Sequence, residues 1–260
     1  MLFLLRVNYH TSIQPHINRS TLMATYKTHA IILSSFPYKE HDRIITFFSE
    51  DYGRIDARAR GSRKITSKLA GHLEQFIETE LLLANGRRWD ILAGSRTIEP
   101  FFMIRTDLYK TAAAAVCVEA TKIVTKPLNR EYMIYALLRK TLEQIEQSQT
   151  PNQDVVYRFL WQLLGRAGFA PEIERCIVSK APVTTTGYFS FEGGGILAQV
   201  YRERDSNALE IDMRDFVALP NTQEPLSQTM RTLISTFWQR VIDHTDLRSW
   251  TFFMNTYGNF

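Results

Sequence analysis

The chain has 260 residues, of which 45% are apolar and 22% are charged, and its formal net charge is +4. This composition excludes an intrinsically disordered chain, and the small basic excess permits a polyanionic partner without requiring one. Two cysteines, neither of them in a C-x-x-C pair, exclude a disulfide framework. No apolar run approaches the roughly 18 residues that a membrane-spanning helix needs. We therefore expect a cytoplasmic protein with no membrane contact.

Residues 1–23 precede the first regular pattern in the chain. Their apolar start ends at Arg6, so it is shorter than the roughly 7–15 residues of the apolar region of a secretory signal. Regular patterning begins just after Met23. We expect residues 1–23 to be a flexible N-terminal extension that adds nothing to function.

The segment that follows has the pattern of short strands. Apolar or alternating runs lie at residues 30–33, 43–48, 54–60, 76–83 and 89–93. In the third run, polar and apolar residues alternate with period two, so its arginines share one face of a strand and its apolar residues the other. Asn85-Gly86, between the last two runs, is typical of a tight hairpin turn. Five short strands predict a small closed barrel.

Beyond residue 104 the apolar period changes to that of helices. Helices are predicted at residues 107–126, 131–147, 155–167 and 226–245. Pro182 and three consecutive glycines interrupt the segment between the last two, which predicts a small irregular insert containing one short strand. The fold class is α+β, and the predicted parts are a barrel at 24–104, a helical domain at 105–169 and 216–260, and the insert at 170–215.

The main candidate site is a run of basic residues around the end of the third predicted strand. It consists of Arg54, Arg58, Arg60, Arg63, Lys64 and Lys68, with Arg87 and Arg88 in the next hairpin as an extension. A strand that leads into a basic loop suits a phosphate backbone, because each phosphate contact releases counterions. Small barrels of this kind hold single strands of nucleic acid, with aromatic rings stacked on the bases.

Two plainer interpretations stand beside this one. The basic face can simply be solvated, and the aromatic residues that alternate with it can belong to the core. These aromatic residues are Phe47, Phe48, Tyr52, Phe76 and Trp89. We expect most of them in the core and a minority stacked on bases.

Nothing in the sequence predicts catalysis. The acidic pairs Glu40/Asp42 and Glu50/Asp51 lie at strand ends and turns, and they do not form the converging set that a two-metal nuclease needs. Cys117 falls in an alanine-rich helix, where a small buried thiol is expected. The chain has no phosphate-binding G-x-x-x-x-G-K-[ST] loop. We expect no enzyme activity, no cofactor and no metal ion.

The order of several short motifs resembles the RecO family, a family of recombinational-repair mediators. The motifs of the barrel segment are AIIL at 30–33, YKEHDR at 38–43, FSEDYGR at 48–54, ARGSR at 59–63 and LEQF at 73–76. The resemblance continues through RTDL at 105–108, FLWQLLGRAGFAP at 159–171 and LRS at 247–249, and it covers residues 24–253.

This resemblance implies an N-terminal OB-fold, a helical domain and a small zinc-finger-like insert. It implies binding of single- and double-stranded DNA and annealing of complementary strands. The implied partners are RecR and the single-strand-binding protein, with loading of RecA onto the coated DNA as the indirect result. The helical domain would present an apolar groove or a basic pocket to protein partners. The basic run chosen above falls in the family's DNA-contacting stretch.

The insert departs from the pattern of many family members, which carry two C-x-x-C pairs. Cys176 occupies the first position, but Ser179 replaces its partner, and the second pair falls on Leu197 and Val200 or on Ala198 and Tyr201. One thiolate cannot form a four-ligand structural zinc site. We expect a metal-free insert held by apolar packing. The expected contributors are Phe191, Leu197 and Val200.

Two other functions remain open at this point. An RNA-binding OB-fold module in translation or ribosome assembly would bind RNA tightly and would not anneal strands. A nuclease or strand-transfer enzyme would show turnover that depends on Mg²⁺, for which the sequence offers no ligand set.

Overall fold

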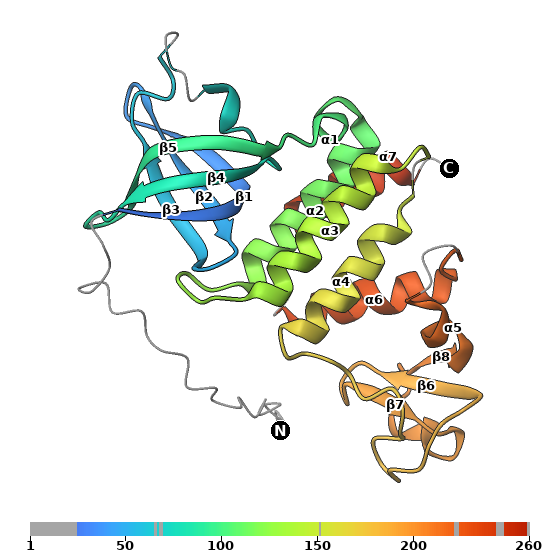
Figure 1. Cartoon of the computed structure of the whole chain (residues 1–260). Coiled ribbons are helices and arrows are strands. Elements are labelled where there is room, and N and C mark those ends of the chain that lie inside the picture. Colours follow the sequence, from blue (N-terminus) through green and yellow to red (C-terminus); the bar gives the residue numbers. More distant parts are fainter. Residues whose placement is uncertain are drawn as a thin grey trace.

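The structure is a computed structural model, and it describes residues 25–64, 67, 70–150, 152–220, 224–242 and 247–258. A five-stranded barrel lies at one end of a helical bundle, and a small three-stranded sheet lies at the other end (Figure 1). The expected extension at 1–23 and Lys68 lie outside the described residues.

The barrel confirms the five strands expected from the sequence. They are β1 (Thr25–Tyr38), β2 (Asp42–Ser49), β3 (Gly53–Ala59), β4 (Glu78–Ala84) and β5 (Asp90–Glu99). The strand order is β1-β2-β3-β5-β4, and the barrel closes because β1 also pairs with β4. The β3–β5 pair is parallel and the others are antiparallel. This OB-like order brings the end of β3 beside the start of β5.

The alternation predicted for β3 is confirmed. Ile55, Ala57 and Ala59 are buried in the barrel core, whereas Arg54 and Arg58 lie half-buried on the opposite face. The period-two pattern arises because successive side chains of a strand point to opposite faces.

The hairpin between β4 and β5 is present, but its tight two-residue turn is not. Residues 85–89 form a longer connection, in which the N–H of Gly86 donates to Asp90 Oδ1 at 3.3 Å. A Cβ on Gly86 would lie 1.9 Å from the carbonyl oxygen of Trp89. Glycine is therefore needed here because two backbone segments approach closely, and the loop carries Arg87, Arg88 and Trp89.

The helical bundle contains the four predicted helices and two more. Its helices are α1 (Phe102–Thr106), α2 (Leu108–Val124), α3 (Tyr132–Gln147), α4 (Asp154–Arg166), α6 (Gln228–Val241) and α7 (Arg248–Tyr257). The sequence did not predict α1 or α7. The predicted apolar stripes are mostly buried in one core, but Leu108 and Met133 are 60% and 61% exposed, because both lie in the first turn of their helices.

The insert is more regular than expected. β6 (Thr186–Ser190) is flanked by β7 (Gly195–Leu197) and β8 (Leu209–Asp212), and a 3-10 helix η2 (Gln199–Arg204) and α5 (Met213–Ala218) complete it. Phe189 packs against Phe237 of α6, and Phe191 packs against Phe189, so the insert shares the core of the bundle. Leu197 is buried as expected, but the expectation for Val200 was wrong: it is 82% exposed.

Buried contacts fix the barrel to the bundle. The carboxylate of Glu78 in β4 accepts hydrogen bonds from the Tyr135 hydroxyl and from Arg139 Nε of α3, each at 3.0 Å. Gly53, at the start of β3, has φ +68°, and a Cβ there would lie 1.9 Å from the carbonyl oxygen of Asn129. The barrel therefore sits directly on the α2–α3 connection. None of the helices in the described part of the chain has the length and apolarity to cross a membrane.

Candidate nucleic-acid interface

One end of the barrel carries two aromatic rings surrounded by cations. The rings of Tyr38, at the end of β1, and Trp89, just before β5, lie edge to face with centroids 5.0 Å apart. Lys39 and Arg58 lie over the Tyr38 ring at 5.7 and 5.5 Å, and Arg88 lies over Trp89 at 4.3 Å. These distances are those of cation–π contacts.

Arg63 is held beside this group by hydrogen bonds to backbone carbonyl oxygens of the β1–β2 turn. Its guanidinium donates to the carbonyl oxygen of Glu40 at 3.2 Å, and its N–H donates to that of His41 at 2.9 Å. The basic–aromatic cluster is defined here as Tyr38, Lys39, Arg58, Arg63, Arg88 and Trp89. Lys39, Arg63 and Arg88 are exposed, whereas the two rings and Arg58 are half-buried, so the cluster offers both charge and flat apolar surface to a ligand.

Asp42 sets the geometry of the cluster. Its carboxylate accepts from the N–H of Gly61 at 2.7 Å and from Nε and Nη2 of Arg58 at 2.7 and 2.5 Å. Asp42 thereby orients the Arg58 guanidinium toward the Tyr38 ring and fixes Gly61 at the start of the basic loop. The N–H of Gly61 and the charge of Arg58 together outweigh burial and hold the pKa of Asp42 below its usual value.

The lowered pKa of Asp42 predicts how stability depends on pH. The contribution of Asp42 is complete above the unfolded-state pKa of about 3.9 and is lost as the pH falls through the lower folded-state value. We expect the melting temperature of Asp42→Asn to lie below that of the wild type at neutral pH. This difference should shrink as the pH falls below about 4, because the unfolded state then binds a proton at Asp42 that the folded state binds only at lower pH. Thermal melts of both proteins between neutral and acidic pH measure it, and a difference that persists unchanged into acid would contradict this role.

The structure brings together only part of the basic run predicted from the sequence. Arg58, Arg63 and Arg88 belong to the cluster, and Arg60, Lys64 and Arg87 are exposed in the same two loops. No ion pair joins these last three to an acid in the part of the chain that the structure describes. Lys68 lies outside that part.

Arg54 lies apart from the other basic residues. Its Nη1 donates to the carbonyl oxygen of Lys122 near the end of α2 at 2.5 Å, and its carbonyl accepts from the N–H of Leu128 at 3.0 Å. These bonds point Arg54 toward the helical bundle.

The sequence did not single out Tyr38 and Lys39. The sequence feature that could have predicted them is a tyrosine followed by a lysine at the end of a strand. Such a pair places an aromatic ring and a positive charge next to each other at a turn. Among the aromatic residues weighed for stacking, Phe47, Phe48 and Phe76 are buried and Tyr52 packs on Tyr26. Trp89 alone of that set joins the cluster.

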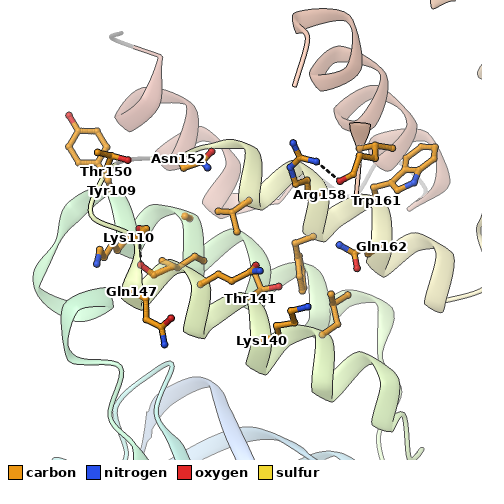
Figure 2. A pocket seen from close by; sticks show the side chains of 18 of the residues that line it. Tyr109, Lys110, Lys140, Thr141, Gln147, Thr150, Asn152, Arg158, Trp161 and Gln162 are labelled. Atoms are coloured by element: carbon orange, nitrogen blue, oxygen red, sulfur yellow. Dashed lines mark hydrogen bonds between the residues drawn. The ribbon is translucent and has the colours of Figure 1, made fainter. Parts of the chain in front are cut away.

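A cleft of about 900 Å³ opens between α2, α3 and α4 (Figure 2). Phe159 and Trp161 supply apolar surface, while Lys110 and Lys140 bring positive charge to it. Among the described residues of the lining Asp107 alone is acidic, and it already accepts from the N–H of Lys110 at 3.0 Å as the N-cap of α2. The cleft therefore combines apolar surface with uncharged polar and basic side chains.

The insert does not fit the zinc that the resemblance implies. Cys176 Sγ accepts from the N–H of Ala198 at 3.3 Å, and Ser179 stands where the second thiol of a C-x-x-C pair would be. Burial raises the pKa of Cys176, but hydrogen bonds from Ala198 and Ser179 outweigh it and lower that pKa to about 7. A single thiol and no cluster of three metal-binding side chains occur here among the described residues. Cys117 is buried as expected, and burial raises its pKa.

Comparison with known proteins identifies the family. The profile of "Recombination protein O N terminal" matches residues 23–101, and that of "Recombination protein O C terminal" matches residues 105–246. A protein of Gloeothece citriformis named DNA repair protein RecO is 31% identical over 229 residues, which cover 84% of this chain and 80% of the relative. A protein of the same name from Dehalococcoides mccartyi is 36% identical over 173 residues, or 66% of this chain and 68% of the relative. This chain therefore belongs to the RecO family.

Proposed function

We propose that this RecO-family chain is a DNA-binding recombination mediator in DNA repair. It binds single- and double-stranded DNA, anneals complementary strands and, with RecR, helps to load RecA onto DNA coated by the single-strand-binding protein. The observation that carries the proposal is the basic–aromatic cluster on the OB-like barrel. The proposed site residues are Arg54, Arg58, Arg60, Arg63, Lys64, Lys68, Arg87 and Arg88, together with Trp89, a stacking candidate from the sequence, and with Tyr38 and Lys39, which lie in the same cluster.

Charge explains how such a surface would promote annealing without turnover. Two complementary strands repel each other through their phosphates, and cations bound to both strands reduce that repulsion and release counterions. Arg60, Arg63 and Lys64 are exposed on a loop at one side of the cluster, and Arg87 and Arg88 are exposed on another. The two loops can therefore contact separate stretches of backbone. The proposal is a binding function with no catalytic step, carried out in the cytoplasm at the nucleoid.

Trp89 is expected to favour single strands over duplexes, because only an unpaired base can stack on it. A base–aromatic stack contributes about 1–3 kcal/mol. Trp89→Leu should therefore weaken binding of a single-stranded oligonucleotide by roughly 5- to 150-fold. Duplex affinity should change far less. Fluorescence anisotropy with both ligands measures the two effects. Tyr52→Leu is the matched control, and an equal loss for both ligands would contradict stacking.

The cleft between α2, α3 and α4 is the proposed docking site for the protein partners. Its apolar and basic lining residues suit a short segment that carries both apolar and acidic side chains. RecR and the single-strand-binding protein are the partners that the family resemblance implies. Lys140 is exposed at the rim, so Lys140→Glu tests this docking without disturbing the core.

The deciding experiment is fluorescence-monitored annealing of two complementary oligonucleotides at low and moderate salt. We expect the wild type to accelerate annealing and salt to suppress the effect. The variant Arg60→Ala/Arg63→Ala/Arg88→Ala should lose the activity while its circular dichroism spectrum is unchanged. Absence of both annealing and salt-sensitive DNA binding would overturn the proposal. Tight binding of a single-stranded RNA without annealing would instead support the RNA-binding alternative.

A further inference from the structure

A third aromatic ring lies on the same face of the barrel as the basic–aromatic cluster. Phe36 of β1 is 48% exposed, and it precedes Tyr38 by two residues. Alternate residues of a strand point to the same face, so the two rings lie on one side of β1. The register supports this placement, because Phe36 pairs with Ile44 of β2, and Ile44 pairs with Arg58 of β3. Directly paired residues share a face of the sheet, so Phe36 adjoins the cluster.

The neighbours of Phe36 distinguish it from an ordinary exposed side chain. Apolar side chains that are exposed singly are common on protein surfaces and indicate nothing. Phe36 instead lies beside the rings of Tyr38 and Trp89, whose centroids are 5.0 Å apart. Ile44, opposite Phe36 on β2, is only 1% exposed, so the aromatic ring forms the surface at this point. Three neighbouring aromatic side chains, with Arg58 lying 5.5 Å from the Tyr38 ring, give a surface on which bases can stack.

A lysine of the bundle lies at the far end of this aromatic row. Ser34, two residues before Phe36 in β1, accepts from Lys122 Nζ at 2.9 Å. This bond uses one of the three N–H donors of the ammonium group, so Lys122 can also donate to a phosphate. Asp56 is an acid on the same face, but it lies on β3, two strands away from β1, and it already accepts from Thr46 at 2.7 Å. The positive charge of Lys122 therefore lies nearer to the row than the negative charge of Asp56.

We propose that Phe36 is a stacking residue for single-stranded DNA, and that the bound strand runs from Trp89 over Tyr38 and Phe36 to Lys122. This inference rests on the DNA-binding function proposed above and adds the path of the strand. Two residues of β1 rise by about 6.6 Å, which is roughly twice the 3.4 Å between stacked base pairs of a duplex. Bases on Tyr38 and Phe36 are therefore held apart, so the row fits an unstacked single strand.

Phe36→Leu tests the stacking directly, because leucine keeps an apolar side chain beside Ile44 but has no aromatic face. It should weaken binding of a single-stranded oligothymidine by about 10-fold and leave duplex affinity unchanged. Phe36→Tyr keeps an aromatic face and should bind as the wild type does. Phe102→Leu is the matched control, because Phe102 is 59% exposed on α1 of the bundle. Fluorescence anisotropy measures each protein with both ligands.

Photochemical crosslinking locates the strand independently of affinity. An oligothymidine with 5-iodouracil at one position is irradiated in complex with the full chain, and mass spectrometry identifies the crosslinked residues. We expect crosslinks at Tyr38 and Phe36, and none at position 36 in Phe36→Leu. Lys122→Gln keeps a donor for Ser34 and removes the charge, so it should reduce the slope of log K against log salt by about 0.7. Lys180→Gln, at an exposed position of the insert, should leave that slope unchanged.

The outcomes separate this path from the proposed function. If the wild type binds the single strand and Phe36→Leu binds it equally well, the path is wrong and the DNA-binding function stands. Equal losses for single strand and duplex in Phe36→Leu would reflect damage to the barrel and would also overturn stacking. An unchanged salt slope in Lys122→Gln would overturn the end of the path at Lys122. A wild type that binds no single strand would overturn the path and the proposed function together.

Discussion

Alanine at Arg60, Arg63 and Arg88 together is expected to weaken binding of a single-stranded oligonucleotide by about 100-fold near 0.1 M salt. Each phosphate contact contributes about 0.7 to the slope of log K against log salt for a single strand. Removing three contacts should therefore reduce that slope by about 2. All three side chains are exposed, so their removal leaves no cavity in the barrel. Arg58 is left intact because it is the partner of Asp42.

The control for this prediction removes the same charge elsewhere. Arg166, Arg202 and Arg204 are exposed on α4 and η2, away from the barrel. Alanine at these three positions changes the net charge equally but touches neither loop of the cluster. Titrations at several salt concentrations should show a nearly unchanged slope for this control. Equal losses in the two triple variants would mean that net charge, and not this surface, governs binding.

The sequence predicted the barrel because its signals are local. The alternation from Arg54 to Arg60 fixes one strand, and the buried residues of β3 follow it. The cluster could not be predicted in the same way. Tyr38 and Trp89 are far apart in the chain, and they meet only because β3 pairs with β5 in parallel while β1 and β2 close the other side. Contacts of that kind depend on strand order, which no local period specifies.

Arg54 shows the limit of the same reasoning. It shares a face of β3 with Arg58, and the period-two pattern correctly predicted this. The pattern does not reveal what covers each end of the strand. The carbonyl oxygen of Lys122 lies at the Arg54 end, and Tyr38 lies at the Arg58 end. Two arginines of one strand therefore have different surroundings.

Helices with weak local signals escaped prediction. Only Ile104 of the five-residue α1 is buried, so it has no apolar period to detect. α7 buries Phe253 and Tyr257, and its first N–H groups are capped by Glu119, a residue of α2 far away in sequence. Val200 was placed in the core of the insert because of its position in a family motif. The 3-10 helix η2, none of whose residues is buried, exposes it instead.

Asp154→Asn is expected to lower the free energy of unfolding by about 3 kcal/mol, because it leaves the guanidinium groups of Arg158 and Arg231 without a nearby carboxylate. Asp154 is 5% exposed, and its carboxylate accepts from Arg231 Nε at 2.8 Å and from the N–H of Leu226 at 2.9 Å. Arg158, also 5% exposed, donates to the carbonyl oxygens of Ala218, Leu219 and Glu224 and depends on the nearby charge of Asp154.

An asparagine retains the size of Asp154 and an acceptor for Leu226, so the loss reports the missing charge. The melting temperature should fall by roughly 6–12 °C. Asp212→Asn removes the negative charge beside Arg214, whose side chain is 89% exposed, and keeps the oxygen that caps α5, so it should leave the melting temperature unchanged. A melt of Asp154→Asn that coincides with that of the wild type would contradict the role of the buried charge. Because Asp154 and Arg158 hold Leu219 and Leu226 against α4, and Leu219 lines the cleft, partner docking should weaken in this variant. DNA affinity should not change, because the basic–aromatic cluster lies on the barrel.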